Sequence, residues 1–242
     1  ARLQEGAATQ TTQHDIDILR RAWNWGRSRG FCPDKTLPKP RLVIQPTRQK
    51  YTPSRVEYWK VVDQLNGWPK LLVLLMGATG TRVGEASSLC WSHVDLETGE
   101  ITIPSKKGIT KTLYRKTVIP VPLLETLKAM EPGAPQQRLI PVSVDTARTS
   151  ITQRYLKDAC KAAKVPYFTP HGLRRMVIDQ SYTSGVDVGT VAAMLGQSPQ
   201  VALRHYRQAR RSDKEKAARI AGLGERGESN VIEFDKRLTK DA

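Results

Sequence analysis

Five prolines lie from residue 32 to residue 53, and no other feature constrains the fold of this 242-residue chain as strongly. Because proline lacks a backbone N–H and fixes φ, neither a helix nor a central strand can run through this stretch. Basic residues alternate with the prolines, which favours an extended, positively charged linker. The chain is therefore predicted to hold an N-terminal piece (residues 1–40), a basic proline-rich linker (41–52), a main domain (53–210) and a C-terminal tail (211–242). The prolines are Pro33, Pro38, Pro40, Pro46 and Pro53, and the basic residues are Lys35, Lys39, Arg41, Arg48 and Lys50.

Helical patterns dominate on both sides of the linker. Residues 12–29 carry Ile16, Leu19 and Trp23 at i, i+3 and i+7, which predicts one amphipathic helix. In the main domain, Thr52-Pro53, Thr81 and Ser198-Pro199 are typical helix starts, since each offers a capping hydroxyl. Further helices are predicted over residues 69–75, 122–130, 145–164, 171–184 and 187–195. Two β signals, at residues 100–104 and 117–121, predict a small antiparallel sheet. The expected fold class is therefore mainly α with a small antiparallel β-sheet (α+β).

The charge of the chain favours a polyanionic partner. Its 39 Lys and Arg against 23 Asp and Glu give a formal charge of +16, which attracts phosphate groups and favours binding through release of their counterions. Nucleic acid is the first interpretation, although basic proteins can also be ribosomal, lie at membrane surfaces or simply be soluble.

Neither a metal centre nor a cofactor is indicated by the residues. The cysteines are Cys32, Cys90 and Cys160, which lie far apart and form no CxxC pair. The longest apolar run, residues 71–76, is far shorter than the roughly 20 residues of a bilayer span, and no signal peptide opens the chain. We therefore expect a cytoplasmic protein without membrane contact. Because the chain begins without Met inside ordinary domain sequence, we also expect it to be part of a longer protein.

Two short motifs place arginines at helix starts. Thr79 to Glu85 reads Thr-Gly-Thr-Arg-Val-Gly-Glu, which brings the Arg82 guanidinium beside free backbone N–H groups, an arrangement suited to phosphate. The plain alternative is a helix cap with a solvated Arg82 paired to Glu85. His171-Gly172-Leu173-Arg174 puts His171 and Arg174 on one helix face, where both can meet one anionic group.

Two further segments carry candidate functional residues. Leu195-Gly196-Gln197 is followed, nine residues after Gln197, by Tyr206, which taken alone would be an ordinary half-buried aromatic residue. Residues 105–111 carry Lys106, Lys107 and Lys111 at the expected hairpin, where they would face solvent or phosphate.

Together these segments resemble the catalytic domain of the tyrosine recombinase (phage integrase) family over about residues 51–209. Arg82 and Glu85 match the family's Thr-Gly-x-Arg-x-x-Glu pattern, and His171 with Arg174 match its His-x-Leu-Arg box in full. Tyr206 matches the nucleophile. The hairpin lysine is best matched by Lys106, with Lys107 as a competitor, and Gln197 stands where the family has His. The resemblance also implies that residues 1–40 are the C-terminal remnant of a helical core-DNA-binding domain.

The resemblance implies a mechanism without metal. Tyr206 would attack a DNA phosphate and form a 3′-phosphotyrosyl link with release of a 5′-hydroxyl. Arg82 and Arg174 would hold the non-bridging oxygens. His171 would accept the proton of Tyr206, whose ordinary pKa is about 10, and Lys106 would protonate the leaving oxygen.

Gln197 departs from the family pattern. An amide can donate a hydrogen bond to a phosphate oxygen but carries no charge and shuttles no proton. We therefore expect a supporting role for Gln197 and slower cleavage than with His at that position.

The implied partner is double-stranded DNA, bound by a homo-tetramer that holds two duplexes and exchanges C-terminal tails. The alternative for the tail is a helix packed on its own domain. Accessory directionality factors are further candidate partners, and the expected location is the bacterial cytoplasm at the nucleoid. The candidate DNA contacts are Lys107, Lys111, Arg115, Arg148, Arg154, Arg175 and Arg204.

Two other functions remain open at this point. A type IB topoisomerase would use similar chemistry on a similar domain but relax supercoils as a monomer. A regulator could retain the fold and bind DNA without cleaving it.

Overall fold

The computed structural model describes residues 4–40, 42, 51–104 and 114–206, without the side chains of residues 199 and 204–206. The chain divides into two compact units, residues 1–50 and residues 51–242. Among the residues that the structure describes, no helix is long and apolar enough to cross a membrane. The elements, in chain order, are α1 (Thr9–Arg27), α2 (Arg55–Val62), α3 (Gly67–Thr79), α4 (Val83–Ala86), the 3₁₀ turn η1 (Trp91–His93), β1 (Glu100–Pro104), β2 (Tyr114–Val118), α5 (Val121–Lys128), α6 (Val144–Ser150), the π-helical turn η2 (Ile151–Tyr155), α7 (Leu156–Ala162), α8 (Pro170–Thr183), α9 (Val188–Leu195) and α10 (Pro199–Tyr206).

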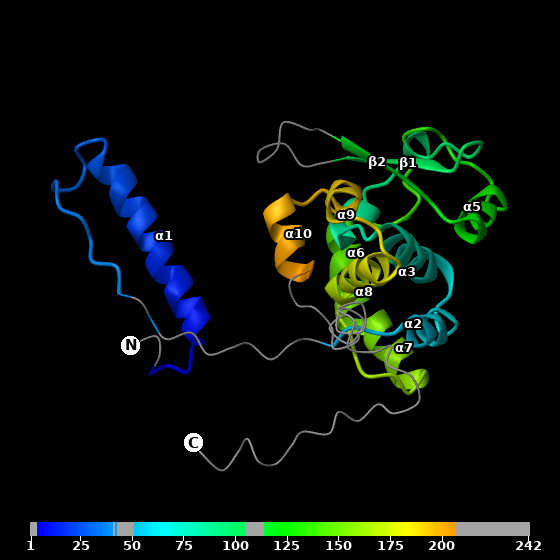
Figure 1. The fold of residues 1–242 in the computed structure, drawn as a ribbon, viewed down its shortest axis with the longest axis horizontal. Helices are drawn as coiled ribbons and strands as arrows, with labels where there is room; N and C mark the ends of the chain where they lie inside the picture. Colours follow the sequence, from blue (N-terminus) through cyan, green and yellow to red (C-terminus); the bar gives the residue numbers. More distant parts are fainter. Residues whose placement is uncertain (1–3, 41, 43–50, 105–113, 207–242) are drawn as a thin grey trace, which may run out of the picture. The chain divides into compact units, whose positions relative to one another are not determined.

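The first unit consists of α1 and the segment that folds back along it (Figure 1). The amphipathic helix predicted over residues 12–29 is present and begins three residues earlier. The return segment is attached by the indole N–H of Trp23, which donates to the carbonyl of Lys35 at 2.7 Å, and by Gln13, which accepts the N–H of Leu42 at 3.0 Å. Gly26 is the residue of this helix that is buried.

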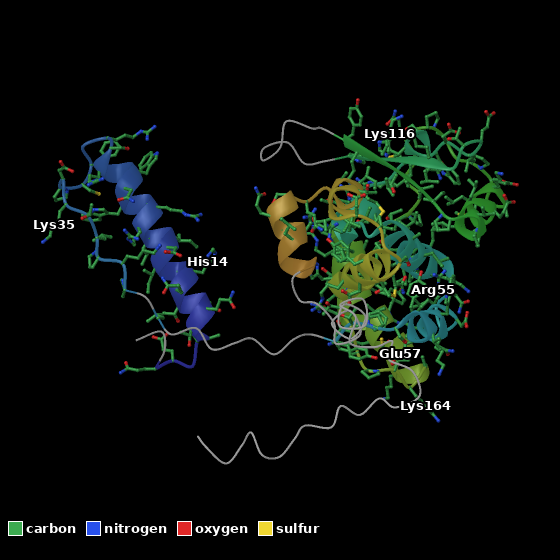
Figure 2. The ribbon with its side chains drawn as sticks, in the orientation of Figure 1. His14, Lys35, Arg55, Glu57, Lys116 and Lys164 are labelled. Atoms are coloured by element: carbon green, nitrogen blue, oxygen red, sulfur yellow. The ribbon has the colours of Figure 1, made fainter. Side chains whose placement is uncertain are left out.

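The core of the second unit forms around α3 and α8, which lie side by side in Figure 1. Leu72, Leu75 and Leu173, on these two helices, are fully buried. Helices α2 and α7 lie at one end of the unit, and the sheet with α5 lies at the other. Figure 2 marks the two ends by Lys116, on the sheet, and Lys164, which follows α7. The element content confirms the predicted fold class, mainly α with a small antiparallel sheet.

The starts of α2 and α4 differ from the sequence prediction. Ser54, not Thr52, caps α2: its hydroxyl accepts the N–H of Glu57 at 3.3 Å, and the Glu57 carboxylate accepts the N–H of Ser54 at 2.8 Å. This reciprocal pair is a capping box, which stabilises a helix start by about 1 kcal/mol. Thr81 does not cap α4, because it is buried and its hydroxyl lies 2.9 Å from that of Thr79.

The sheet is a single antiparallel pair in which Ile103 lies opposite Arg115 and Ile101 opposite Thr117. Strand β2 covers residues 114–118, whereas the sequence predicted 117–121. The strand ends early because Pro120, which cannot donate to a ladder, begins the turn into α5. Ile101 and Ile103 are fully buried, so the face of the sheet that carries them packs on the core.

The last helices are fixed by their end residues. Asp187 caps α9, at the start of the helix predicted over residues 187–195, by accepting the N–H of Thr190 at 2.9 Å. Gly196 ends α9 in the left-handed region, at φ 59°, where glycine pays no steric penalty. Helix α10 then begins directly after Ser198 and packs against α9.

Candidate active site

Arg174 joins the C-terminal ends of two helices. Its side chain is buried, and its two terminal nitrogens donate to the carbonyl of Gly80 and to the carbonyl of Leu195, each at 2.8 Å. Gly80 follows α3 and Leu195 is the last residue of α9. The last carbonyls of a helix lack partners within it and carry a partial negative charge, so the cation satisfies both ends.

The same burial shifts the pKa of Arg174. Burial, together with the nearby cations Arg82 and Arg115, lowers the pKa of Arg174 to about 10, while Glu85 acts in the opposite direction. The guanidinium therefore remains charged near neutral pH. The two hydrogen bonds use two of the five N–H donors that a guanidinium carries.

Glu85 lies at the start of α4 and holds Arg82. One of its carboxylate oxygens accepts the backbone N–H of Arg82 at 3.0 Å, and the other accepts a guanidinium N–H of Arg82 at 2.8 Å. The Arg82 side chain is 55% exposed, whereas that of Glu85 is 17% exposed. Arg82 is thus presented to solvent from a fixed backbone position.

Arg115 reaches the same carboxylate from the sheet. Its Nη2 donates to Glu85 at 2.8 Å and its Nε donates to the carbonyl of Met194 at 3.0 Å. The side chain is 11% exposed, so this predicted DNA contact lies within the cluster rather than extended from the surface.

Arg115 and Arg82 keep Glu85 ionised. Burial raises the pKa of Glu85, but hydrogen bonds from Arg115 and Arg82 and the charge of Arg115 outweigh it and bring the pKa below its ordinary value of 4.5. The result is a cluster of Arg82, Arg115 and Arg174 around one carboxylate, with a net excess of positive charge beside the ends of α3 and α9.

His171 and Gln197 flank this cluster along the chain. His171 is exposed on the first turn of α8, one turn before Arg174. Gln197 follows Gly196, and its side-chain nitrogen is buried without a hydrogen-bond partner among the described residues. A buried amide N–H₂ normally has an acceptor, so an oxygen of a bound group would satisfy it.

Tyr206 is the last residue of α10. This helix is held on the second unit by Ala202, which is buried and whose carbonyl accepts the hydroxyl of Tyr182 at 3.3 Å. The side chains of Tyr206 and Arg204 lie outside the described part of the chain, as do Lys106, Lys107, Lys111 and the tail, residues 211–242.

The model of the phage integrase family matches residues 56–213, which include Arg82, the His171 to Arg174 box and Tyr206. The chain belongs to the phage integrase family. Among curated proteins, this integrase-family chain is 24% identical over 238 residues to a "Tyrosine recombinase XerC-like" protein of Caldanaerobacter subterraneus subsp. tengcongensis, and the match covers 81% of the chain and 61% of that protein. It is 29% identical over 248 residues to "Tyrosine recombinase XerA" of Thermococcus onnurineus, with 92% and 80% covered.

The same fold occurs in a solved tyrosine recombinase structure. The chain matches the Tn1549 transposon integrase, solved in complex with a circular intermediate DNA, with a TM-score of 0.69 at 14% identity, over 91% of this chain and 82% of that one. The likeness confirms the predicted catalytic-domain fold. The integrase-family chain spans about 61% of the length of the XerC-like relative.

The remaining predicted DNA contacts occupy separate places in this integrase-family fold. Arg148 is half exposed, and its Nη1 lies 3.7 Å from Oδ1 of Asp145. Its side chain also packs against Gly84 of α4, the helix that directly follows Arg82. Arg154 lies over the ring of Tyr155, 5.4 Å from its centroid. Two side-chain nitrogens of Arg175, Nε and Nη2, are buried and have no hydrogen-bond partner within the described ranges.

Sequence reasoning missed the backbone acceptors of the site. The carbonyls of Gly80, Met194 and Leu195 hold Arg174 and Arg115, and no residue type identifies a carbonyl as an acceptor. A signal was nevertheless present, because a glycine that ends a helix marks a cluster of carbonyls without intrahelical partners.

Proposed function

We propose that this chain is the catalytic part of a site-specific DNA recombinase that cleaves and rejoins DNA through a 3′-phosphotyrosyl intermediate, and so integrates or excises a mobile element. The single observation that carries the proposal is the cluster around Glu85, in which Arg82, Arg115 and Arg174 concentrate positive charge beside two helix ends. Such a cluster suits a group with several anionic oxygens, and DNA supplies one at every phosphate.

Family membership supports the choice of DNA over other phosphates. The curated relatives are named tyrosine recombinases, and the Tn1549 integrase is solved with a circular intermediate DNA. The formal charge of +16 also favours a polyanion.

In the proposed reaction the hydroxyl oxygen of Tyr206 attacks phosphorus, the bond to the 5′-oxygen breaks, and the 3′-phosphate becomes linked to the tyrosine. His171 accepts the tyrosine proton, and Lys106, or Lys107 in its place, gives a proton to the 5′-oxygen. The number of phosphodiester bonds is conserved, so the reverse attack by a 5′-hydroxyl rejoins the strand without ATP.

The arginines hold the charge that develops on the non-bridging oxygens. Arg174 keeps three N–H donors beyond the two that bind carbonyls, and Arg82 is exposed and fixed by Glu85. Two permanent cations then serve where other phosphoryl-transfer sites use metal ions. The buried nitrogen of Gln197 supplies a further neutral donor.

We also propose that the active assembly is a homo-tetramer on two duplexes, with exchange of the tails, residues 211–242, and with accessory directionality factors at the bacterial nucleoid. Residues 1–40 then belong to a second DNA-binding domain, connected by the linker at 41–52.

The test is covalent trapping on DNA. The protein is incubated with a pool of random-sequence duplexes that carry nicks, so that the released fragment diffuses away and the adduct persists, and the retained DNA is sequenced. We expect one family of sequences, an adduct that Tyr206→Phe abolishes, and duplex binding that Tyr206→Phe preserves. An adduct that survives in Tyr206→Phe would refute the nucleophile, and no adduct with the wild type would favour a non-catalytic DNA-binding regulator. Relaxation of supercoiled plasmid that lacks any selected site would favour the topoisomerase function.

A further inference from the structure

We propose that Arg115 is a positioning residue, which fixes Arg82 and the corner between α9 and α10 relative to each other. This inference rests on the proposed function, because it concerns the alignment of that site. It assigns Arg115 a role inside the protein in place of a contact with DNA.

Arg115 binds two acceptors that lie on different helices. The Arg115 side chain starts from β2 and donates to two other elements, to Glu85 on α4 and to the carbonyl of Met194 on α9, at 2.8 and 3.0 Å. Both bonds come from different nitrogens of one planar group, so they fix the distance between α4 and α9 as well as the place of β2.

Each of these two acceptors is in turn connected to a residue of the proposed site. Glu85 binds both the backbone N–H and the guanidinium of Arg82, so its position sets that of Arg82. Met194 lies three residues before Gln197, at the end of α9, and α10 with Tyr206 follows directly. A shift of Arg115 would therefore change both sides of the site at once.

Arg115 also packs against Gly196, which lies between α9 and α10. A Cβ atom built at Gly196 would lie 3.0 Å from Nη1 and 3.1 Å from Cδ of Arg115. The guanidinium thus lies directly on the backbone of the glycine that ends α9. Only 11% of the side chain is exposed, because its two hydrogen bonds and its contact with Gly196 hold it against the protein.

A lysine at position 115 could not bind both acceptors in the way that arginine does. A lysine ammonium is a point charge on a flexible stem and lacks the planar fork that reaches two acceptors in fixed directions. Arg115→Lys therefore keeps the charge and loses the bridge, whereas a simple phosphate contact would tolerate the change.

The experiment compares Arg115→Lys and Arg115→Met with Lys116→Met. Lys116 is the next residue of the same strand, is exposed and pairs with Glu100 on the surface, so its variant loses the same charge without touching the cluster. For each protein we measure the thermal midpoint, duplex affinity as a function of salt, single-turnover cleavage at saturating DNA, and backbone amide exchange. The DNA is the nicked duplex that the wild type selects from the random pool.

We expect both Arg115 variants to bind DNA within about twofold of the wild type with the same salt dependence, because no phosphate contact is lost. Cleavage at saturating DNA should fall about 10²-fold, the size of effect that a misplacement of about 1 Å produces. Amides of residues 82–86 and 192–197 should both exchange faster. Lys116→Met should leave cleavage and exchange in these segments unchanged.

Wild-type cleavage by Arg115→Lys would overturn the proposal, and so would weaker DNA binding with a salt slope reduced by about 1, which is the sign of a lost phosphate contact. If Arg115→Met fails to fold, Arg115→Lys still decides. If the wild type forms no covalent adduct, the proposed function fails, but amide exchange still tests the coupling: unchanged exchange in either segment of Arg115→Lys would refute it.

Discussion

Gly196 and Arg115 are in direct contact: a Cβ at Gly196 would lie 3.0 Å from a guanidinium nitrogen of Arg115, close enough that Arg115 would have to shift by a few tenths of an ångström. Gly185 offers a matched comparison, since it also has a positive φ, 81°, and an added Cβ there would meet nothing within 4 Å. The two glycines share a backbone requirement and differ in what surrounds them.

Gly185→Ala should therefore cost about 1 kcal/mol of unfolding free energy from the backbone alone. Gly196→Ala should cost more, because Arg115 must move, and should also slow cleavage. Denaturant unfolding and single-turnover cleavage of both variants test this. Equal costs and equal cleavage rates would contradict the contact.

Replacing Arg174 by Lys should damage both stability and catalysis. One ammonium cannot follow the fork geometry by which Arg174 binds the carbonyls of Gly80 and Leu195. A buried acceptor left unsatisfied costs about 1–3 kcal/mol, and loss of one anion-stabilising donor slows cleavage about 10²–10³-fold. Lys128→Arg, which changes an exposed cation paired with Glu125, is the control and should leave cleavage within about twofold. Full activity of Arg174→Lys would refute the assignment.

Gln197→His should accelerate cleavage of a nicked duplex. The amide nitrogen of Gln197 is buried without a partner among the described residues, and Gln197 directly follows Gly196, which contacts Arg115. An imidazole at this position can donate a hydrogen bond and also carry charge or a proton. Gln197→Ala, which removes the donor, should be slower than the wild type. Cleavage by Gln197→His that is unchanged or slower would show that Gln197 is no weak point.

The charge of Glu85 should make stability depend on pH. Its pKa in the folded protein lies below the ordinary 4.5, so its contribution is fully present above the unfolded pKa and is lost as pH falls through the folded value. The stability advantage of the wild type over Glu85→Gln should therefore shrink as the pH falls below about 4.5. Glu125→Gln, which alters an exposed pair with Lys128, should show little change with pH. An advantage of wild type over Glu85→Gln that grows toward low pH would contradict the assigned direction.

Lys164→Gly should stabilise the protein. Lys164 follows α7 with φ 55°, a conformation that suits glycine and strains other residues. We expect a gain of about 0.5–1 kcal/mol and a thermal midpoint higher by a few degrees. Lys161→Gly, inside α7, should instead lose about 1 kcal/mol. A lower midpoint for Lys164→Gly would show that the lysine makes compensating interactions.

Much of the fold could be predicted because helix ends carry local signals. Asp187 and Gly196 mark the ends of α9 in the sequence as they do in the structure. The helix start predicted at Thr52 lies at Ser54 in the structure, and the sequence carries a signal for it: Glu57 lies three residues after Ser54, the spacing of a capping box.

The inward position of Arg115 could not be predicted, and the reason is the register of the sheet. The predicted strand at residues 117–121 left Arg115 in the hairpin, where a basic residue faces solvent. The observed strand pairs it with Ile103, which is buried, and residues directly opposite in a sheet point to the same face. A strand boundary that was wrong by three residues thus changed the environment assigned to a charged side chain.

The two carbonyl bonds of Arg174 bear on how this fold could lose its activity over generations. A residue that serves only the chemistry can be replaced with little harm to folding, but Arg174 connects the ends of α3 and α9 to each other. If the proposed mechanism holds, descendants that cease to cut DNA should therefore lose Tyr206 early and retain Arg174 long afterwards. Among proteins of this fold, an arginine at this position would then indicate a folded domain, and the tyrosine would indicate, by the proposed mechanism, that the domain still cuts DNA.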